Sequence, residues 1–533
     1  MEPLRSEVSE KSNVSQAAVT VGFYTFLSRI LGLVRDVVVA RFFGAGMAAD
    51  AFFVAFRIPN LLRRLFAEGS LTIAFIPVFT EYLTRRSRDE AFQMARAALT
   101  LLSLLLAVVA LLGVLFAPWI VRVQAFGFGG AGMKYDLTVL LTRITFPYIF
   151  LVSLVAFFMG ILNSLRHFAA PAAAPIFLNV GIIGATLWLS PRLEQPIVGV
   201  AMGVIIGGLL QVALQVPWLL RMGVSLVPCW MPSHPAVKKV GLLMVPAIFG
   251  SAIYQLNQFI GTLLASFLRE GSISWLYYAD RIVEFPLGVF AIAVSTAVLP
   301  SLAKQAADHH LADFRDTLGH SLRLVFFMTL PSMAGMIVLR EPMIQVFFQR
   351  GAFDSFSSHM TAVALLYYSL GLWAFSANRV MVSAFYAFQD TKTPVKVATA
   401  TMVANGTFSL LLMGPLQHGG LALSLSLAST LQFFVLVLVL KKRKGIFELM
   451  PVLQSAVKSL VASLIMGLAV FYLNAHWLTK AEPLSPMTLT AKLVVTVLIG
   501  GVIYFAAAGV LGSSELSSAG DLFRPVIAKF KRK

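Results

Sequence analysis

Apolar runs of about 20 residues recur along the whole chain, and no polar stretch between them is long enough to fold as a separate soluble domain. A run of that length matches a helix that crosses the hydrocarbon core of a bilayer. Only 12% of the 533 residues are charged and 58% are hydrophobic, whereas soluble domains are about 25% charged and about 45–50% apolar. The sequence therefore predicts an all-α polytopic membrane protein that works within the bilayer.

Hydropathy along the chain predicts fourteen transmembrane helices. Their expected ranges are 17–43, 50–81, 93–117, 137–165, 168–190, 196–221, 238–268, 272–303, 314–339, 357–388, 394–414, 418–440, 450–474 and 488–512. The first run continues well past the length of a signal peptide, so we expect it to be retained as a helix. With the amino terminus inside, the inner connectors are the richer in Lys and Arg, including KKRK at 441–444. Both termini are therefore expected to be cytoplasmic.

The net charge is +18, from 42 Lys and Arg against 24 Asp and Glu. This excess is spread over short connectors and helix interiors, so membrane anchoring and anionic ligands explain it better than nucleic acid does.

The single cysteine, Cys229, excludes an internal disulfide and a Cys-based metal cluster. The glycine-rich stretch FGFGGAGMK at 126–134 lacks the ending of a phosphate-binding loop and is interpreted as an outer connector.

The chain also resembles itself after a shift of 223 or 224 positions. RIPNLLRRLFAEGSLTIAFIPVF, which starts at Arg57, aligns with RIVEFPLGVFAIAVSTAVLPSL, which starts at Arg281. Because each repeat holds six helices, an even number, both halves have the same orientation in the membrane. Parallel repeats of this kind occur in transporters, which bind their ligand between the two halves. The predicted parts are an N-lobe (17–221), a cytoplasmic linker (222–237), a C-lobe (238–440), two extra helices (450–512) and a basic cytoplasmic tail (513–533). Three glycines spaced four apart predict close helix packing: Gly199, Gly203 and Gly207.

Ionisable residues interrupt the apolar run FLSRILGLVRDVVVA at 26–40. Each costs roughly 2.5–3.5 kcal/mol at the centre of a bilayer, so these side chains are expected to face protein or a water-filled cavity. Arg29 and Asp36 are seven positions apart and share a helix face, with Gly32 between them as a notch. Arg35 is predicted to point elsewhere.

Two further segments carry charges within apolar sequence. The first, DAFFVAFRIPNLLRRLFAEGS at 50–70, contains a proline expected to kink the helix. It also contains five charged residues and one amide: Asp50, Arg57, Asn60, Arg63, Arg64 and Glu68. Glu68 lies one turn beyond Arg64, so charges are expected to pair within this helix, which leaves Arg63 without an obvious local partner. The second, SWLYYADRIVEFPLG at 274–288, groups Asp280, Arg281 and Glu284 with Ser274.

The bases in these segments are all arginines. A guanidinium stays charged in a low-dielectric site and binds phosphate bidentately, which favours a diphosphate as the ligand. The predicted substrate-binding residues are Arg29, Arg35, Arg63, Arg281, Arg57, Arg64, Asn60 and Ser274. The predicted gating and charge-pairing residues are Asp36, Asp50, Glu68, Asp280 and Glu284. No catalytic residue, metal ligand or cofactor is predicted, and a structural salt bridge remains the alternative role for Arg281.

Four segments resemble the MurJ (MviN) lipid II flippases, of the multidrug/oligosaccharidyl-lipid/polysaccharide exporter (MOP) superfamily. They are SRILGLVRDVVVARFFGAGMAADAFFVAFRIPNLLRRLFAEGS, FPYIFLVSLVAFFMGILNS, ASFLREGSISWLYYADRIVEFPLGV and QDTKTPVK at 389–396. The resemblance implies two six-helix lobes around a cationic cavity, two extra C-terminal helices that form a groove for the lipid tail, and essential arginines at Arg29, Arg35, Arg63 and Arg281. One departure is Arg57, where relatives can carry lysine.

The resemblance also implies a substrate, undecaprenyl-diphosphate-linked disaccharide pentapeptide, which moves from the inner to the outer leaflet of the bacterial cytoplasmic membrane. An inside-negative potential favours outward movement of an anion by about 2.3 kcal/mol per charge per 100 mV, so we expect the potential to be required; a coupling ion stays open. The expected partners are lipid II, membrane lipids and the cell-wall synthesis and division machinery, without nucleic acid. The alternative is a related exporter of another polyprenyl-linked oligosaccharide or of drugs. An enzyme acting on the same lipid, or a division scaffold, would leave the buried arginines unexplained.

Overall fold

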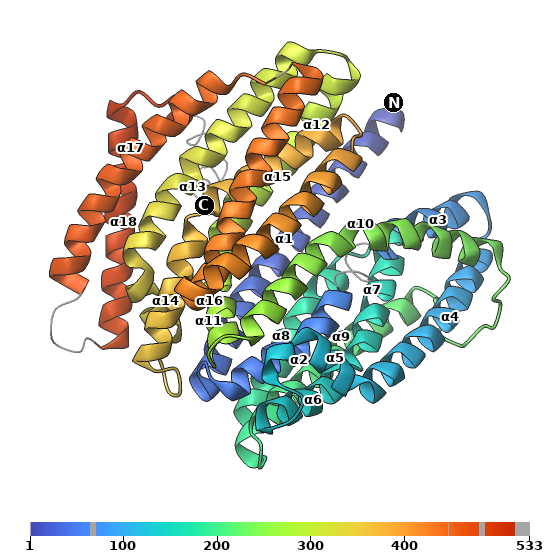
Figure 1. Cartoon of the computed structure of the whole chain (residues 1–533). Coiled ribbons are helices and arrows are strands. Elements are labelled where there is room, and N and C mark those ends of the chain that lie inside the picture. Colours follow the sequence, from blue (N-terminus) through green and yellow to red (C-terminus); the bar gives the residue numbers. More distant parts are fainter. Residues whose placement is uncertain (1, 64–70, 446, 479–484, 518–533) are drawn as a thin grey trace. The chain divides into compact units, whose positions relative to one another are not determined.

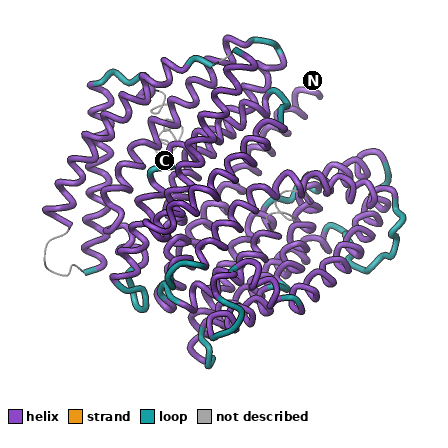
Figure 2. Tube along the Cα trace, viewed as in Figure 1, coloured by secondary structure: helices purple, strands orange, loops and turns teal. Residues whose placement is uncertain are grey.

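The structure, a computed structural model, describes residues 2–63, 71–445, 447–478 and 485–517. In these ranges the chain is helical apart from short turns and loops, and no strand occurs in them (Figure 2). Helices satisfy their own backbone N–H and C=O groups, as hydrocarbon surroundings require. The all-α prediction is confirmed. The chain divides into two compact units, Met1–Ser274 and Trp275–Lys533, and the lobe boundaries drawn from the repeat remain a prediction.

The described residues of unit 1 form ten helices and the start of an eleventh, together with two short 3-10 turns (Figure 1). Their bounds are α1 (Glu2–Phe43), α2 (Met47–Leu62), α3 (Leu71–Arg85), α4 (Arg88–Leu115), α5 (Ala117–Gln124), η2 (Phe126–Phe128), α6 (Met133–Thr145), α7 (Tyr148–Ser164), α8 (Ala169–Trp188), η3 (Ser190–Arg192), α9 (Ile197–Arg221), α10 (Pro235–Ser266) and α11 (Ser272–Pro286). Helix α11 begins in unit 1 and continues into unit 2.

Unit 2 contains the rest of α11 and the remaining helices. Their bounds are η4 (Leu287–Ala291), α12 (Ile292–Ala307), α13 (Leu311–Phe348), α14 (Ser355–Ser369), α15 (Leu372–Ala387), α16 (Lys392–Lys444), α17 (Leu449–Leu473), η5 (Asn474–Leu478) and α18 (Pro486–Val510). The last two long helices, α17 and α18, pack side by side and against α13 (Figure 1). The Tyr504 hydroxyl strengthens this packing, because it donates to the carbonyl of Phe327 on α13 at 2.6 Å.

Helix breaks refine the predicted ranges. The backbone leaves the helical region within α16 at Gln417, with φ 51° and ψ −133°, which confirms the expected boundary between 394–414 and 418–440. The range 357–388 holds two helices, α14 and α15, bent by 43°. The range 50–81 holds α2 and α3, and residues 64–70 between them lie outside the described part.

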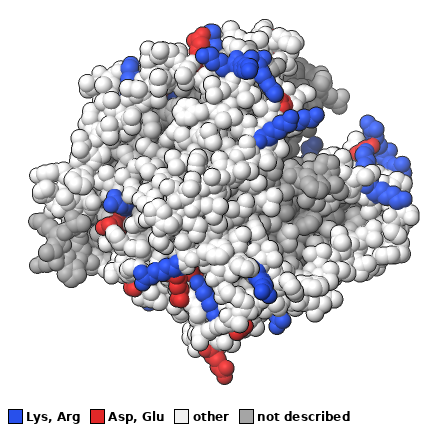
Figure 3. Space-filling model, in the orientation of Figure 1, with Lys and Arg blue, Asp and Glu red and all other residues white. Residues whose placement is uncertain are grey.

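Within the described residues, nine helical segments are long and apolar enough to cross a membrane, or up to ten with the bent pair. The count of fourteen remains a prediction. Charged side chains are few on the face shown in Figure 3, and uncharged side chains cover most of it. Such a surface suits contact with lipid.

The close approach of α8 and α9 confirms the packing predicted from the glycines of α9. A Cβ added at Gly207 would lie 2.9 Å from the Cα of Leu178, and one added at Gly203 would meet α8 at the same distance. On the facing side, a Cβ at Gly181 would lie 2.5 Å from the Cα of Gly207. Only residues without a side chain allow two helix backbones to come this close.

The segment between α9 and α10, which was predicted as an inter-lobe linker, is held against α4. The Arg88 side chain donates to the carbonyl of Met222, and Arg96 donates to that of Val227, both at 2.9 Å. Two residues further, the backbone N–H of Cys229 donates to the Thr100 hydroxyl at 2.8 Å. These bonds place the connector along one side of α4 within unit 1.

Candidate functional site

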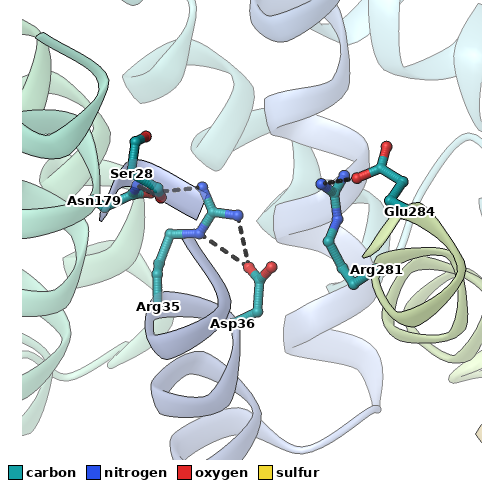
Figure 4. A network of polar contacts seen from close by, with 6 residues as sticks. All are labelled: Ser28, Arg35, Asp36, Asn179, Arg281 and Glu284. Atoms are coloured by element: carbon teal, nitrogen blue, oxygen red, sulfur yellow. Dashed lines mark hydrogen bonds and ion pairs between the residues drawn. The ribbon is translucent and has the colours of Figure 1, made fainter. Parts of the chain in front are cut away.

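A polar cluster joins α1 to α8 inside unit 1 (Figure 4). Arg35 donates from Nε and Nη2 to Oδ1 of Asp36, at 2.9 and 2.7 Å, and from Nη1 to Oδ1 of Asn179 at 3.2 Å. The Asp36 side chain is buried and that of Arg35 is half-buried. The prediction that Arg35 points away from Asp36 is wrong, because the long arginine side chain curls back to reach its neighbour. The guanidinium is held on two sides by partners from two helices.

Two other residues of α1 were predicted to share the face of Asp36, namely Arg29 and Gly32. The Arg29 side chain is exposed. The notch predicted at Gly32 faces α8, since a Cβ added there would lie 3.8 Å from Nδ2 of Asn179. The same amide nitrogen donates to the carbonyl of Ser28 at 3.1 Å. A Cβ at this distance would make an ordinary van der Waals contact, so Gly32 faces the amide that contacts Arg35 but is not required for its position.

Helix α2 presents a second group of predicted residues. Arg57 donates from Nη2 to both the carbonyl and the side-chain oxygen of Gln258 on α10, each at 3.2 Å. Arg63, just after the helix, donates from Nε to Oδ1 of Asn60 at 3.0 Å. The expectation that Arg63 lacks a local partner is wrong, because Asn60 precedes it by one helical turn. Two further predicted residues, Arg64 and Glu68, lie outside the described residues.

Asp50 is 1% exposed and is surrounded by donors. Its Oδ2 accepts from Nζ of Lys134 at 2.9 Å and from the backbone N–H of Gly271 at 2.8 Å. Its Oδ1 accepts from the backbone N–H and the hydroxyl of Ser274, at 3.0 and 2.7 Å. Two of these donors belong to the start of α11, where the helix dipole also favours an anion. The carboxylate therefore fixes the first turns of α2, α6 and α11 to one another.

The structure gives two residues that bind Asp50 a different role from the one that the sequence predicts. Lys134 was assigned to a flexible connector, but it lies in the first turn of α6 and forms an ion pair with Asp50. Ser274 was predicted to bind substrate; it is fully buried, and both its hydroxyl and its backbone N–H bind Asp50.

The predicted residues of α11 that belong to unit 2 form their own pair. Arg281 donates from Nη1 to Oε2 of Glu284 at 2.7 Å, one turn along the helix (Figure 4). Its guanidinium also lies over the ring of Tyr277, 4.8 Å from the ring centre. Asp280, the neighbouring acid, is half-buried. The pairing of Arg281 with Glu284 is the one that their spacing predicts.

Sequence reasoning missed three partners of these charges: Asn179, Gln258 and Lys134. They lie 144, 201 and 84 positions from Arg35, Arg57 and Asp50 respectively. The available signal was a polar side chain in apolar surroundings, as with Asn179 in the run APIFLNVGIIGA at 174–185. That signal marks a polar residue for attention, but it does not name its partner.

The clusters hold arginine side chains in place through hydrogen bonds and ion pairs. Guanidinium groups kept charged in apolar surroundings bind anions, above all the oxygens of phosphate groups. Asp36 and Glu284 each neutralise one arginine, so an anionic ligand would compete with them for these groups. The chemistry that this arrangement supports is reversible anion binding.

Comparison with known sequences identifies the family. The family model described as "Lipid II flippase MurJ" matches residues 39–494. The chain is 41% identical over 437 residues to the probable lipid II flippase MurJ of Vibrio cholerae, which covers 81% of this chain and 83% of that protein. It is 36% identical over 508 residues to the lipid II flippase MurJ of Burkholderia cenocepacia, with 94% and 98% covered.

Solved structures agree with the sequence comparison. A lipid II flippase MurJ in an inward closed conformation superposes with a TM-score of 0.77 at 27% identity, over 96% of this chain and 100% of that one. An inward-facing MATE family transporter of the MOP superfamily gives a TM-score of 0.67 at 14% identity, over 80% and 99%, which shows the shared fold alone. The chain therefore belongs to the lipid II flippase MurJ family, whose members are membrane transporters with the MOP-type fold.

Proposed function

We propose that this chain, a lipid II flippase of the bacterial inner membrane by its family, binds the diphosphate of its substrate through arginines. The substrate, undecaprenyl-diphosphate-linked peptidoglycan precursor, would pass from the inner to the outer leaflet by alternating access. The observation that carries this proposal is the Arg35 guanidinium, held by Asp36 and Asn179 within an apolar helix. An ionised group kept there at a cost of a few kcal/mol needs a function that uses its charge.

Asp36 acts in this proposal as the resident counter-ion of Arg35. Without substrate, the carboxylate keeps the buried guanidinium paired, and removing one partner of such a pair costs about 3–5 kcal/mol. When a diphosphate arrives, its oxygens compete with Asp36 for the same N–H donors. The exchange between two anionic partners lets the site bind and release the headgroup without creating an unpaired charge. Glu284 has the same relation to Arg281 in unit 2.

The proposed diphosphate ligands are Arg29, Arg35, Arg63 and Arg281, with Arg57, Arg64 and Asn60 as supporting residues. The proposed gating acids are Asp36, Asp50, Glu68, Asp280 and Glu284. Ser274 already binds Asp50 through both its groups, so a contact between Ser274 and substrate requires that this cluster opens first.

The membrane potential is the proposed source of energy. Because lipid II is anionic, an inside-negative potential favours movement of its uncompensated charge to the outer leaflet, by roughly 2.3 kcal/mol per charge per 100 mV. We place both termini in the cytoplasm, in keeping with the distribution of Lys and Arg among the connectors. Proteins of cell-wall synthesis and division are the proposed partners.

Replacement in cells tests the proposal. Cells depleted of their own flippase would receive Arg→Lys and Arg→Ala variants at Arg29, Arg35 and Arg281, and lipid II in the outer leaflet would be measured. The bidentate mechanism requires both sets of variants to fail, whereas simple charge neutralisation lets the lysine variants work. Arg85→Ala is the control, because Arg85 has a side chain 79% exposed. Full transport by all the alanine variants would refute the mechanism.

A further inference from the structure

We propose that Asn179 is a positioning residue for the diphosphate site, which sets the direction of the Arg35 guanidinium without reducing its charge. This inference rests on the proposed role of Arg35 in substrate binding. Asn179 lies on α8, a helix whose residues, Ala169–Trp188, include no charged side chain. Its only link to the substrate would run through Arg35.

The geometry fixes the amide in one orientation. Asn179 is 5% exposed, and its Nδ2 donates to the Ser28 carbonyl at 3.1 Å while its Oδ1 accepts from Arg35 at 3.2 Å (Figure 4). An amide that donates through nitrogen on one side must present its oxygen on the other. The Ser28 carbonyl therefore determines that Arg35 meets an acceptor. A buried amide with both ends bonded is a rigid support.

Asn179 contacts helix α1 along one face, through bonds to Ser28 and Arg35. Gly32, one turn after Ser28, has no Cβ, and an added one would sit 3.8 Å from Nδ2 of Asn179. The amide thus spans two turns of α1, from the carbonyl of Ser28 to the side chain of Arg35. Any shift of α8 along α1 would move the guanidinium with it.

The neutrality of Asn179 is the second part of the argument. Asp36 already supplies one negative charge to Arg35, at 2.7 Å. A second carboxylate at position 179 would also accept from the guanidinium, but it has no N–H to donate to the Ser28 carbonyl, and it would make the local charge negative and repel a diphosphate. An amide supplies the same acceptor atom without that charge. Asparagine is therefore the side chain that orients Arg35 and leaves it attractive to an anion.

Binding of fluorescent lipid II to the purified full-length chain in detergent micelles tests the proposal. We expect Asn179→Ala to weaken binding about tenfold, the factor that corresponds to about 1.4 kcal/mol, through loss of orientation. Asn179→Asp, which keeps the shape of the side chain but loses the donor to the Ser28 carbonyl and adds a negative charge, should weaken binding at least as much. The decisive variant is Asp36→Asn combined with Asn179→Asp, which moves the single carboxylate from α1 to α8. Recovery of binding in this double variant, relative to Asn179→Asp alone, is a result that a purely structural role would not give.

A matched control exists in the same unit. Gln211 on α9 is a buried amide that donates to the carbonyl of Ala174 and accepts from the hydroxyl of Tyr148, so Gln211→Glu adds a carboxylate at a side chain whose bonds are to these two residues and not to Arg35. It should leave lipid II binding unchanged when unfolding temperatures match. If Asn179→Ala does not fold, the binding of lipid II by Asn179→Asp and by the double variant tests the role of Asn179.

The Arg35→Ala variant distinguishes a failure of the proposed function from a failure of the role proposed for Asn179. Wild-type binding by Arg35→Ala would overturn the proposed function itself. Loss of binding in Arg35→Ala together with wild-type binding in Asn179→Asp would overturn only the role of Asn179. Absence of recovery in the double variant would likewise reject the charge argument.

Discussion

The Asp50 carboxylate accepts hydrogen bonds from both the backbone N–H and the hydroxyl of Ser274, a residue 224 positions further along the chain. That separation equals the shift at which the sequence resembles itself. Helices α2 and α11, which the repeat makes equivalent, therefore begin side by side. The duplication remains a prediction, and the bonds show that two positions that it makes equivalent are in contact.

Removal of the Asp50 carboxylate should destabilise the protein strongly. Asp50→Ala leaves Lys134 and the first turn of α11 without their acceptor, and loss of one member of a buried ion pair costs about 3–5 kcal/mol. Asp50→Asn keeps an acceptor for Ser274 and should cost less. Thermal unfolding of the purified protein measures both. Asp89→Asn, at an exposed position of α4, is the control, and an Asp50→Ala variant that unfolds with this control would contradict the role of the cluster.

Two glycines of α8 should differ in their tolerance of a methyl group. In Gly181→Ala the new Cβ would lie 2.5 Å from the backbone of Gly207, so α8 and α9 must separate, at about 1–3 kcal/mol of stability. In Gly184→Ala the new Cβ meets nothing within 4 Å, and better helix propensity should leave stability unchanged or slightly raised. Unfolding temperatures of the two variants provide the test, and equal values would show that this packing is not rigid.

Asp390 should contribute stability that depends on pH. Burial opposes ionisation of its carboxyl, but hydrogen bonds from Thr393 and the charge of Arg443 outweigh it and lower the pKa of Asp390 below its ordinary value of 3.8. A carboxyl with a lowered pKa stabilises the folded state above that value, and the contribution is lost as the pH falls through the folded-state pKa.

The comparison of wild type with Asp390→Asn tests this contribution. The variant should unfold at a lower temperature at pH 7, and the difference should shrink and vanish as the pH is lowered below 3.8. A difference that persists unchanged in acid would assign the effect to shape and not to charge.

The connector after α9 should become accessible when its bonds to α4 are removed. Cys229 is the single cysteine of the chain, and its backbone N–H binds Thr100, so its reaction with a maleimide reports how firmly this segment is held. Arg88→Ala with Arg96→Ala removes two bonds to the connector and should accelerate labelling several-fold. Arg85→Ala should not change the rate. Equal rates in all three proteins would mean that the arginines do not hold the connector.

The local sequence determined the parts of this protein that depend on composition alone. Long apolar runs specify membrane helices because the hydrocarbon core excludes unsatisfied backbone groups, and the boundary near Gln417 is visible where such a run stops. Arginines within apolar runs stand out for the same reason, since Arg29, Arg35 and Arg281 would be costly against lipid. The pair of Arg281 with Glu284 was also predictable, because both belong to one helical turn.

Only the tertiary structure decided which partner each remaining charge would meet. Arg35 binds Asn179, Arg57 binds Gln258 and Asp50 binds Lys134, across 144, 201 and 84 positions of sequence. Hydropathy gives the length of a helix, but the side that it turns to its neighbour follows from packing, such as the close approach of α8 and α9 at Gly181 and Gly207. The energy of a buried charge depends on the few atoms within hydrogen-bonding distance, and those atoms come from helices whose order in space the chain alone does not state.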